Sequence, residues 1–501
     1  RFALGRPPGR AGPGFGPSVL RYIGGMETHD RSLPPVPGPV FLVGLAGIGM
    51  SGLAQLLRDA GYEVHGSDRD RSSPGQRQLL ASLAGRGIRC WPQDGSGVRR
   101  TRPAALIASS AVEEGNPDFR AAAPDCVRLS RAEALADALR RLPGRRIGVA
   151  GSCGKTTVTA WTAAALQALG ERVVMVCGGF VRDFETDARP GNYCGCSAPD
   201  FVVYEADESD GSLVCFRPDW GMVLNIGHDH YGRDELVQLF SRYLRNCRTG
   251  GIVESALQDV FDLPDRLEIR SFGGVDTPAG LAGTGASRYR TSEQGACFRL
   301  SGFGTLQTRQ FGRHSAANGA AVAACVRALL PQTAPSRVAE AIEAFQGVRR
   351  RFERVGRTPR GAVVIDDYAH NVEKIEAAIR AAREAAGNRP LRIVFQPHGY
   401  GPLGFMRREL REALQRVLRP RDCFGLLPVY YAGGTSSFRP RSEEVAEEYR
   451  GAGLPVRWFD DRAAAARAVR EADGDTMVLT MGARDPTLAT WSRSLVAGRQ
   501  P

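Results

Sequence analysis

The sequence predicts an α/β protein of three successive domains. Apolar, strand-like runs alternate with helical runs along most of the 501 residues, and the length suits roughly three domains of ordinary size. Glycine-rich turns between a predicted strand and a predicted helix open the first two domains. We expect domain limits of 37–142, 143–347 and 348–501, with residues 1–36 forming a disordered leader or an over-extension of the chain.

The first domain begins with a strand, a glycine-rich turn, a helix and a second strand over residues 39–68. Gly47, Gly49 and Gly52 fit the pattern G-x-G-x-x-G, and Asp68 follows at the end of the second strand. This pattern is typical of a Rossmann-like domain, whose helix N-terminus holds nucleotide phosphates. Taken alone, it predicts a nicotinamide-dependent oxidoreductase.

A second phosphate-binding pattern, GSCGKTT, opens the central domain at residues 151–157. Lys155 is one of only two lysines among 66 basic residues, the other being Lys374. Glycines let backbone N–H groups surround an anion, a lysine reaches the outer phosphates, and a threonine hydroxyl offers a ligand to Mg²⁺. The wide guanidinium of arginine would not fit the same space. We therefore expect a P-loop-type ATPase domain, although Val149 replaces the first glycine of the strict motif.

Polar clusters follow the next strands of the chain. Residues 205–210 read EADESD and residues 225–230 read NIGHDH, each after a buried-strand pattern. Carboxylates beside a phosphate loop commonly hold Mg²⁺, so the two clusters predict a metal–phosphate site. The third domain adds three arginines in GVRRRFE at 347–353, which can clamp phosphate, and the strand end IDDYAHN at 365–371. Further strands alternate with helices there, which predicts a largely parallel, Rossmann-like sheet.

In this order the motifs closely resemble the Mur ligase family. The resemblance runs over residues 39–484 and consists of G-x-G-x-x-G, GKTT, EADESD, NIGHDH, GRHxxxN, GVRRRFE, DDYAH and FQPH. It implies an ATP-dependent ligase of peptidoglycan synthesis that forms an amide through an acyl phosphate. ATP and Mg²⁺ are the implied cofactors. The implied substrates are UDP-N-acetylmuramate and an amino acid, with L-alanine favoured.

The resemblance also implies a role for each matching residue. Catalytic roles fall on Lys155, Glu205, His230, Arg350, Arg351 and His370. ATP would be held by Gly151, Ser152, Cys153, Gly154, Lys155, Thr156, Thr157, Asn318 near adenine and Asp366 at the ribose. The UDP-sugar and incoming substrate would be held by Gly47, Ile48, Gly49, Met50, Ser51, Asp68 and His398. The implied metal ligands are Thr156, Glu205 and His230.

The third domain departs most from the family pattern. Where the family has FQPHRYxR, this chain has FQPHGYGPLGFMRR, so that Gly399 and Pro402 replace two arginines expected near the incoming substrates. Arg407 or Arg408 could compensate. Ser315 replaces an asparagine in the adenine motif, and the chain reads DDYAHN instead of DDYAHH. The identity of the amino acid therefore stays open, and a paralogue adding another amino acid or a murein peptide is an alternative.

Composition bears on the other function classes. The net charge of +12 comes from arginines spread along the chain without a basic block, which does not favour nucleic-acid binding. No apolar run approaches the ~18 residues of a membrane span. Eleven scattered cysteines indicate reduced thiols in a cytoplasm. We expect a monomer or homodimer. An oxidoreductase would leave GKTT and the acidic clusters unused, and a non-catalytic nucleotide-binding protein is the remaining alternative.

Overall fold

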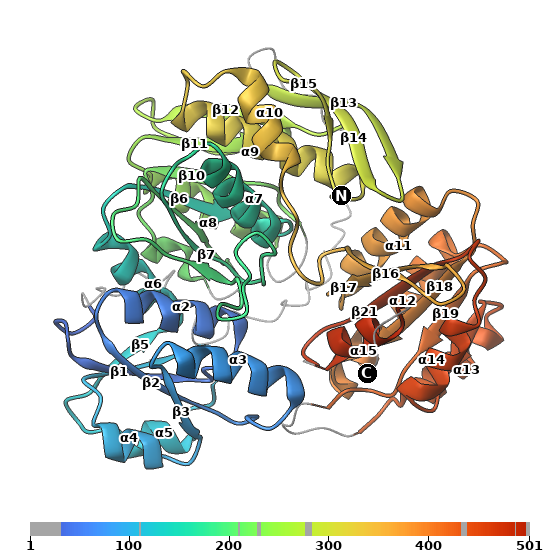
Figure 1. Cartoon of the computed structure of the whole chain (residues 1–501), viewed down its shortest axis with the longest axis horizontal. Helices are drawn as coiled ribbons and strands as arrows, with labels where there is room; N and C mark the ends of the chain where they lie inside the picture. The colour runs from blue at the N-terminus through green and yellow to red at the C-terminus, as the bar shows by residue number, and fades with distance from the viewer. Residues whose placement is uncertain are drawn as a thin grey trace, which may run out of the picture.

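A computed structural model describes residues 32–109, 112–208, 211–227, 232–275, 283–431, 438–485 and 487–496. These residues form three α/β units, each built on its own sheet, in the order of the sequence (Figure 1). The α/β fold class with largely parallel sheets is confirmed. Among the described residues, no helix has the length and apolar character that a bilayer crossing requires.

The first unit is a five-stranded parallel sheet in the order β3-β2-β1-β4-β5. Its strands are β1 (Pro39–Val43), β2 (Glu63–Asp68), β3 (Arg89–Pro92), β4 (Ala105–Ala108) and β5 (Val127–Ser130). Its helices are α2 (Ile48–Asp59), α3 (Pro74–Gly85), α4 (Ser96–Thr101), α5 (Pro117–Ala121) and α6 (Arg131–Arg140). Because the strand order reverses at β1, the glycine-rich turn after β1 lies at the switch point, where such sheets bind ligands.

The central unit is a ten-stranded sheet in the order β15-β14-β13-β12-β11-β10-β6-β9-β7-β8. Its strands are β6 (Arg145–Ala150), β7 (Val173–Val176), β8 (Tyr193–Cys194), β9 (Phe201–Glu205), β10 (Trp220–Val223), β11 (Gly250–Glu254), β12 (Glu268–Gly273), β13 (Thr284–Ser292), β14 (Gly295–Leu300) and β15 (Gly304–Gln307). Its helices are α7 (Lys155–Ala168), α8 (Arg233–Arg245), α9 (Arg313–Leu329) and α10 (Pro335–Glu343), with short 3₁₀ turns at Ser212–Cys215 and Ser255–Leu257. Strand order reverses at β6, directly before the phosphate loop.

Strands β13 to β15 extend the central sheet as an antiparallel meander, which the sequence analysis did not predict. Their apolar positions are sparse, because only one face of this extension packs against the unit: β14 alternates buried Phe298 and Leu300 with the exposed Arg299. The hairpin between β13 and β14 reaches the third unit through Glu293.

The third unit is a six-stranded sheet in the order β16-β17-β21-β18-β19-β20, parallel except at the edge strand β16. Its strands are β16 (Glu353–Arg357), β17 (Val363–Asp367), β18 (Leu391–Gln396), β19 (Cys423–Leu426), β20 (Val456–Trp458) and β21 (Met477–Gly482). Its helices are α11 (Val372–Ala386), α12 (Tyr400–Val417), α13 (Ser442–Gly451), α14 (Arg462–Arg470) and α15 (Leu488–Ser494). The segment 344–352, which carries the three arginines, links this unit to the central one.

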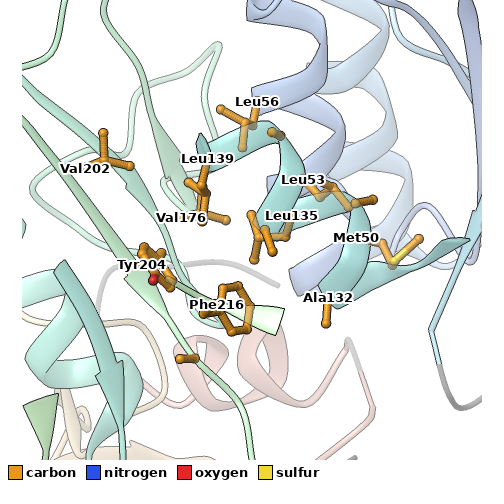
Figure 2. Close-up of a cluster of buried hydrophobic side chains, with 14 of the residues drawn as sticks. Met50, Leu53, Leu56, Ala132, Leu135, Leu139, Val176, Val202, Tyr204 and Phe216 are labelled. Atoms are coloured by element: carbon orange, nitrogen blue, oxygen red, sulfur yellow. The ribbon is translucent and has the colours of Figure 1, made fainter. Parts of the chain in front are cut away.

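One hydrophobic core spans the first two units. Figure 2 shows Leu53 of α2 and Leu135 of α6 beside Val176, Tyr204 and Phe216 of the central unit, all fully or almost fully buried. The other face of the central sheet packs against α7, α9 and α10 in a second cluster. The third unit buries its own two clusters, one on each face of its sheet. The first two units therefore share one extensive apolar core, whereas the third unit has a smaller apolar contact with the central unit, in which Phe311 packs on Phe352 with ring centroids 5.2 Å apart.

Candidate active site

A cavity of about 710 Å³ lies where the three units meet. The first unit contributes the glycine-rich turn and Arg131, the central unit contributes Thr156 and Glu205, and the third unit contributes Tyr368. Of the residues implied by the family resemblance, the lining set includes Gly47, Ile48, Gly49, Met50, Thr156, Glu205, Arg350 and Arg351. The structure thus brings together side chains that are more than 400 positions apart in the sequence, since Arg484 and Arg493 also line the cavity.

The glycine-rich turn is held open by Asp68. The Ala46 N–H donates to Asp68 Oδ2 at 2.8 Å, and Gly47 caps the N-terminus of α2. Burial raises the pKa of Asp68. Ser51 points elsewhere, because its Oγ accepts from Asn192 Nδ2 at 2.9 Å in the interface with the central unit. In this structure Asp68 shapes the turn and Ser51 joins two units, while Gly47 to Met50 face the cavity.

The phosphate loop follows β6 in the conformation its glycines allow. Gly151 and Gly154 have φ angles of 134° and 87°, which an L-residue rarely adopts. Asn225 fixes the loop from the end of β10: the Cys153 N–H donates to Asn225 Oδ1 at 2.8 Å, and Asn225 Nδ2 donates to the Cys153 carbonyl at 3.0 Å. Ser152 Oγ accepts from the Gly227 N–H at 2.9 Å. The backbone of the loop is therefore set by its neighbours, and the unusual Ser-Cys pair is accommodated.

Lys155 is the first residue of α7 and is surrounded by carboxylates. Its Nζ donates to Glu208 at 2.7 Å and to the Gly151 carbonyl at 2.8 Å, and Asp207 lies 3.9 Å away. Burial disfavours the charge, but the fields of Glu208, Asp207 and Glu205 outweigh it and raise the pKa of Lys155. The lysine is therefore a permanent cation held ready at the loop. Glu208, which the resemblance did not single out, is its direct partner.

Thr156 and Glu205 lie on either side of the turn Gly178–Gly179. Glu205 Oε2 accepts from the Gly178 N–H at 2.8 Å, and a Cβ at Gly179 would come within 2.7 Å of the Thr156 side chain. Both residues line the cavity, and hydroxyl and carboxylate oxygens are the ligands that Mg²⁺ prefers. These two side chains fit the implied metal. No group of three acidic, histidine or cysteine side chains suited to a metal occurs among the described residues, and His230 lies outside them.

The three arginines of the linking segment point in different directions. Arg351 Nη2 donates to Thr156 Oγ1 at 3.4 Å, beside the phosphate loop. Arg350 has a φ of 59° and pairs with Asp366 at 3.1 Å, and Arg349 pairs with Glu185 at 2.8 Å. Only Arg351 contacts the phosphate loop directly.

Of the nine residues implied to hold ATP, Thr156 alone lines the cavity, and the rest of the phosphate loop, Asn318 and Asp366 lie outside the lining. Asp366 is buried, bonded to Arg350 and to Thr480 Oγ1 at 3.1 Å, and its burial raises its pKa to about 6 although Arg350 opposes this. Asn318 of α9 lies beside the phosphate loop, with its Oδ1 3.1 Å from the position a Cβ would take on Gly154. Ser315 caps its own turn, its Oγ donating to the Gly312 carbonyl at 2.7 Å. Thr157 lies in the first turn of α7.

His370 and His398 face each other in the third unit, with ring centroids 5.2 Å apart. Neither lines the cavity, but both are close to it: the rings of His370 and Tyr368 are 5.5 Å apart, and Tyr368 is a lining residue. Burial, and then the charges of His370 and Arg484, lower the pKa of His398 to about 4. His398 is therefore neutral at pH 7.

The hypothesis that Arg407 or Arg408 compensates for the missing arginines is wrong in this structure. Arg407 forms an ion pair with Glu448 of α13, and Arg408 pairs with Glu412 at 3.0 Å with 84% of its side chain exposed. Neither residue lines the cavity. Both residues lie on α12, which begins at Tyr400. On this helix Arg407 faces α13 and Arg408 faces solvent, and neither faces the cavity.

Sequence reasoning missed several lining arginines, namely Arg131, Arg189, Arg484 and Arg493. Arg131 had a local signal, because it directly follows Ser130, which ends β5 and forms a capping box with Glu133. Its side chain packs on Gly49 and lies 3.9 Å from Asp207 of the central unit. For Arg484 and Arg493, the sequence carries no motif in which an arginine has a defined role.

Comparison with known proteins agrees with this geometry. Residues 40–142 match the Mur ligase family catalytic domain, and residues 350–484 match the Mur ligase glutamate ligase domain. The chain is 32% identical over 492 residues to UDP-N-acetylmuramate–L-alanine ligase of Maricaulis maris, covering 93% of this chain and 97% of that one. It is 34% identical over 421 residues to the enzyme of the same name from Methylorubrum extorquens, covering 80% and 84%. Its fold resembles the solved UDP-N-acetylmuramate–alanine ligase of Thermotoga maritima, with a TM-score of 0.73 and 24% identity over 91% of this chain and 98% of that one.

Proposed function

The chain belongs to the Mur ligase family, and from this premise we propose that it joins L-alanine to the carboxylate of UDP-N-acetylmuramate at the expense of ATP. The observation that carries the proposal is the shared cavity. It brings a nucleotide-binding turn, the residues Thr156 and Glu205 beside a phosphate loop, and the arginines of the linking segment to one volume. A simple nucleotide-binding protein does not need this convergence, whereas a reaction between two phosphate-bearing substrates does.

The chemistry follows from the charges. The sugar carboxylate attacks the γ-phosphorus of ATP, the bond to the bridging oxygen breaks, and ADP leaves with its electron pair. Two anions must approach each other in this step, and Lys155 beside the loop and Arg351 beside Thr156 are placed to reduce their repulsion. Mg²⁺, held by Thr156 and Glu205, would further neutralise the phosphate oxygens.

The second step forms the amide. The neutral amine of the amino acid attacks the acyl carbon of the acyl phosphate, phosphate leaves, and the ammonium intermediate loses a proton. The acyl phosphate hydrolyses readily, so water must be excluded from the cavity while it exists. The third unit, which contributes Tyr368 and Arg484 to the lining, is the part that could close the cavity from the side opposite the glycine-rich turn.

We also propose that this activity takes place in the cytoplasm, which the odd number of scattered cysteines supports. The absence of nucleic-acid partners and the expected monomer or homodimer stay predictions from the sequence.

Phosphate release from ATP tests the proposal directly. Release should require Mg²⁺, UDP-N-acetylmuramate and an amino acid together, with alanine giving the highest kcat/KM among alanine, glycine, serine and a γ-linked peptide. A better rate with the peptide would identify a peptide-adding paralogue. Calorimetry should detect binding of UDP-N-acetylmuramate and no binding of NADH, and the opposite result would favour an oxidoreductase.

A further inference from the structure

The third unit lacks two arginines at the place where the family resemblance expects the incoming substrate. Gly399 and Pro402 stand in the loop after β18, and Arg407 and Arg408 are engaged elsewhere. An amino acid presents a carboxylate that must remain bound while its amine reacts. A cation is the group that proteins use for this purpose, so the loop after β18 leaves this function to another element.

The neighbouring strand supplies such a cation. In the parallel pairing of β18 with β21, Gln396 is the partner of Gly482, so both strands end at the same level of the sheet. Residues 397–399 and 483–485 therefore continue side by side from the same edge of the sheet. Arg484 lines the cavity, and its charge contributes to the lowered pKa of His398 in the adjacent loop.

The backbone at Arg484 is unusual for an arginine. Its φ is 63°, in the left-handed region where glycine is favoured and a longer side chain is strained. The Arg484 N–H donates to the Tyr368 hydroxyl at 3.3 Å, which ties this turn to the end of β17. A side chain kept at an energetic cost on the wall of a ligand cavity indicates that the side chain, and not the turn, is needed there.

The guanidinium of Arg484 forms no hydrogen bond or ion pair with any described residue. Its neighbour Asp485 does not neutralise it, because the Asp485 carboxylate accepts from Arg462 and from Thr487 Oγ1. An arginine in this state presents a planar set of donors to the cavity, which matches the two oxygens of a carboxylate.

We propose that Arg484 binds the carboxylate of the amine substrate, in place of the arginines that Gly399 and Pro402 have replaced. This inference rests on the proposed ligase function and specifies one subsite of it. Arg493 is the competing candidate, since it also lines the cavity without a hydrogen bond or ion pair among the described residues. It lies on α15 beside Arg349 and Glu353, however, away from the loop after β18.

The test compares L-alanine with L-alaninamide, which keeps the amine and lacks the carboxylate. Arg484→Gly should raise the alanine KM about 10- to 100-fold, since a charge-assisted hydrogen-bonded pair is lost. It should leave kcat/KM for alaninamide, and the KM values for ATP and UDP-N-acetylmuramate, within about twofold of the wild type. The alanine KM of Arg484→Lys should lie between the values of the wild type and of Arg484→Gly.

Glycine suits the backbone at position 484, so the variant should fold at least as stably as the wild type. Arg102→Gly is the matched control, because Arg102 also has a positive φ, of 43°, and lies outside the cavity. Arg493→Ala should not change the preference for alanine over alaninamide.

An equal loss with alanine and alaninamide in Arg484→Gly, or an unchanged alanine KM, would overturn the proposal while leaving the ligase function standing. A selective loss of alanine binding in Arg493→Ala would transfer the subsite to α15. A wild-type enzyme that shows no amino-acid-dependent phosphate release at all would overturn the proposed function, and this inference with it.

Discussion

The first and central units meet mainly through a shared apolar core, whereas the central and third units meet mainly through ion pairs and hydrogen bonds, with the smaller apolar contact of Phe311 and Phe352 beside them. In the first interface Leu53, Leu135 and Phe216 belong to one core, and Asn192 forms hydrogen bonds with three residues of α2, namely Ile48, Ser51 and Gln55. In the second, Glu293 at the β13–β14 hairpin forms ion pairs with Arg357 and Arg389, and Tyr289 donates to Glu384 at 2.8 Å. Both interfaces border the same cavity.

This difference separates a rigid part from an adjustable one. Apolar burial contributes roughly 25 cal/mol for each Å² and is lost only by separating the surfaces. Partly exposed ion pairs each contribute about 0–1 kcal/mol and are weakened by salt. The glycine-rich turn and the phosphate loop therefore belong to one body. The third unit, which carries Arg484, is held mainly by the weaker contacts, and we expect it to change its position more easily than the first unit.

The linking segment fits this division. Gly347 has a φ of 98°, and Arg350 and Phe352 have φ values of 59° and 48°, so three left-handed residues fall within six positions. Strained backbone of this kind concentrates at functional and switching segments. Because Arg351 contacts Thr156 while Arg350 is tied to Asp366 of the third unit, the segment connects the phosphate loop to the third unit.

The largest effect should come from breaking the apolar interface. Phe216→Ala removes a buried ring that packs against Tyr204 with ring centroids 5.1 Å apart, and should lower the free energy of unfolding by about 3–5 kcal/mol. Denaturant unfolding monitored by circular dichroism measures this loss. Phe405→Ala is the control, since Phe405 is 88% exposed, and it should change stability by less than about 0.5 kcal/mol. A similar loss in both variants would mean that burial of Phe216 in the apolar interface adds no specific stability.

Within the rigid body, a substitution in the phosphate loop should lower the catalytic rate without changing the stability of the fold. Lys155→Arg should lower kcat about 10²–10³-fold, equivalent to ~3–4 kcal/mol, because a preorganised charge is lost and the larger guanidinium does not fit. Steady-state kinetics and thermal unfolding together measure both quantities. Lys374→Arg, at the only other lysine, should retain the wild-type rate. Near-normal turnover by Lys155→Arg would exclude Lys155 from the reaction.

Substitutions of the two glutamates of EADESD should change different kinetic quantities. Glu205→Ala should raise the Mg²⁺ concentration needed for half-maximal activity by about 10-fold or more, because a proposed metal ligand is lost. Glu208→Ala should lower kcat without shifting the Mg²⁺ requirement, since Glu208 is the partner of Lys155 at 2.7 Å. A Mg²⁺ titration of activity separates these outcomes. A shift in Glu208→Ala alone would mean that Glu208 is the metal ligand.

The smallest effect should come from the ionic interface. Glu293→Gln should lower the free energy of unfolding by no more than about 1 kcal/mol. It should also weaken the docking of the third unit on the central unit. Small-angle scattering should show a larger radius of gyration for the variant in low salt, and the wild type should approach that value as salt is added. Glu268→Gln is a suitable control, because among the described residues Glu268 forms its one ion pair with Arg270 of the central unit. Identical scattering of Glu293→Gln and the wild type at every ionic strength would contradict this account of the interface.

The sequence by itself determined the local architecture and the phosphate loop. Alternating apolar runs predicted the parallel strands of all three units, and GSCGKTT predicted a loop whose glycines have positive φ and whose lysine opens α7. These features depend on residues close together in the chain, so periodicity and spacing are sufficient to reveal them. The sheet extension β13–β15 was missed because its strands have few apolar positions.

Tertiary structure alone decided which side chains share the cavity. Ser51 belongs to a fingerprint that predicts substrate contact, yet Asn192, 141 positions away, draws it into an interface. Asp366 ends a strand as predicted, but Arg350 and Thr480 enclose it. Arg484 carries no motif, and only the pairing of β21 with β18 places it beside the loop that lacks arginine. Each outcome depends on packing between distant segments, and a side chain's environment is set by these neighbours and not by the residues adjacent to it in the chain.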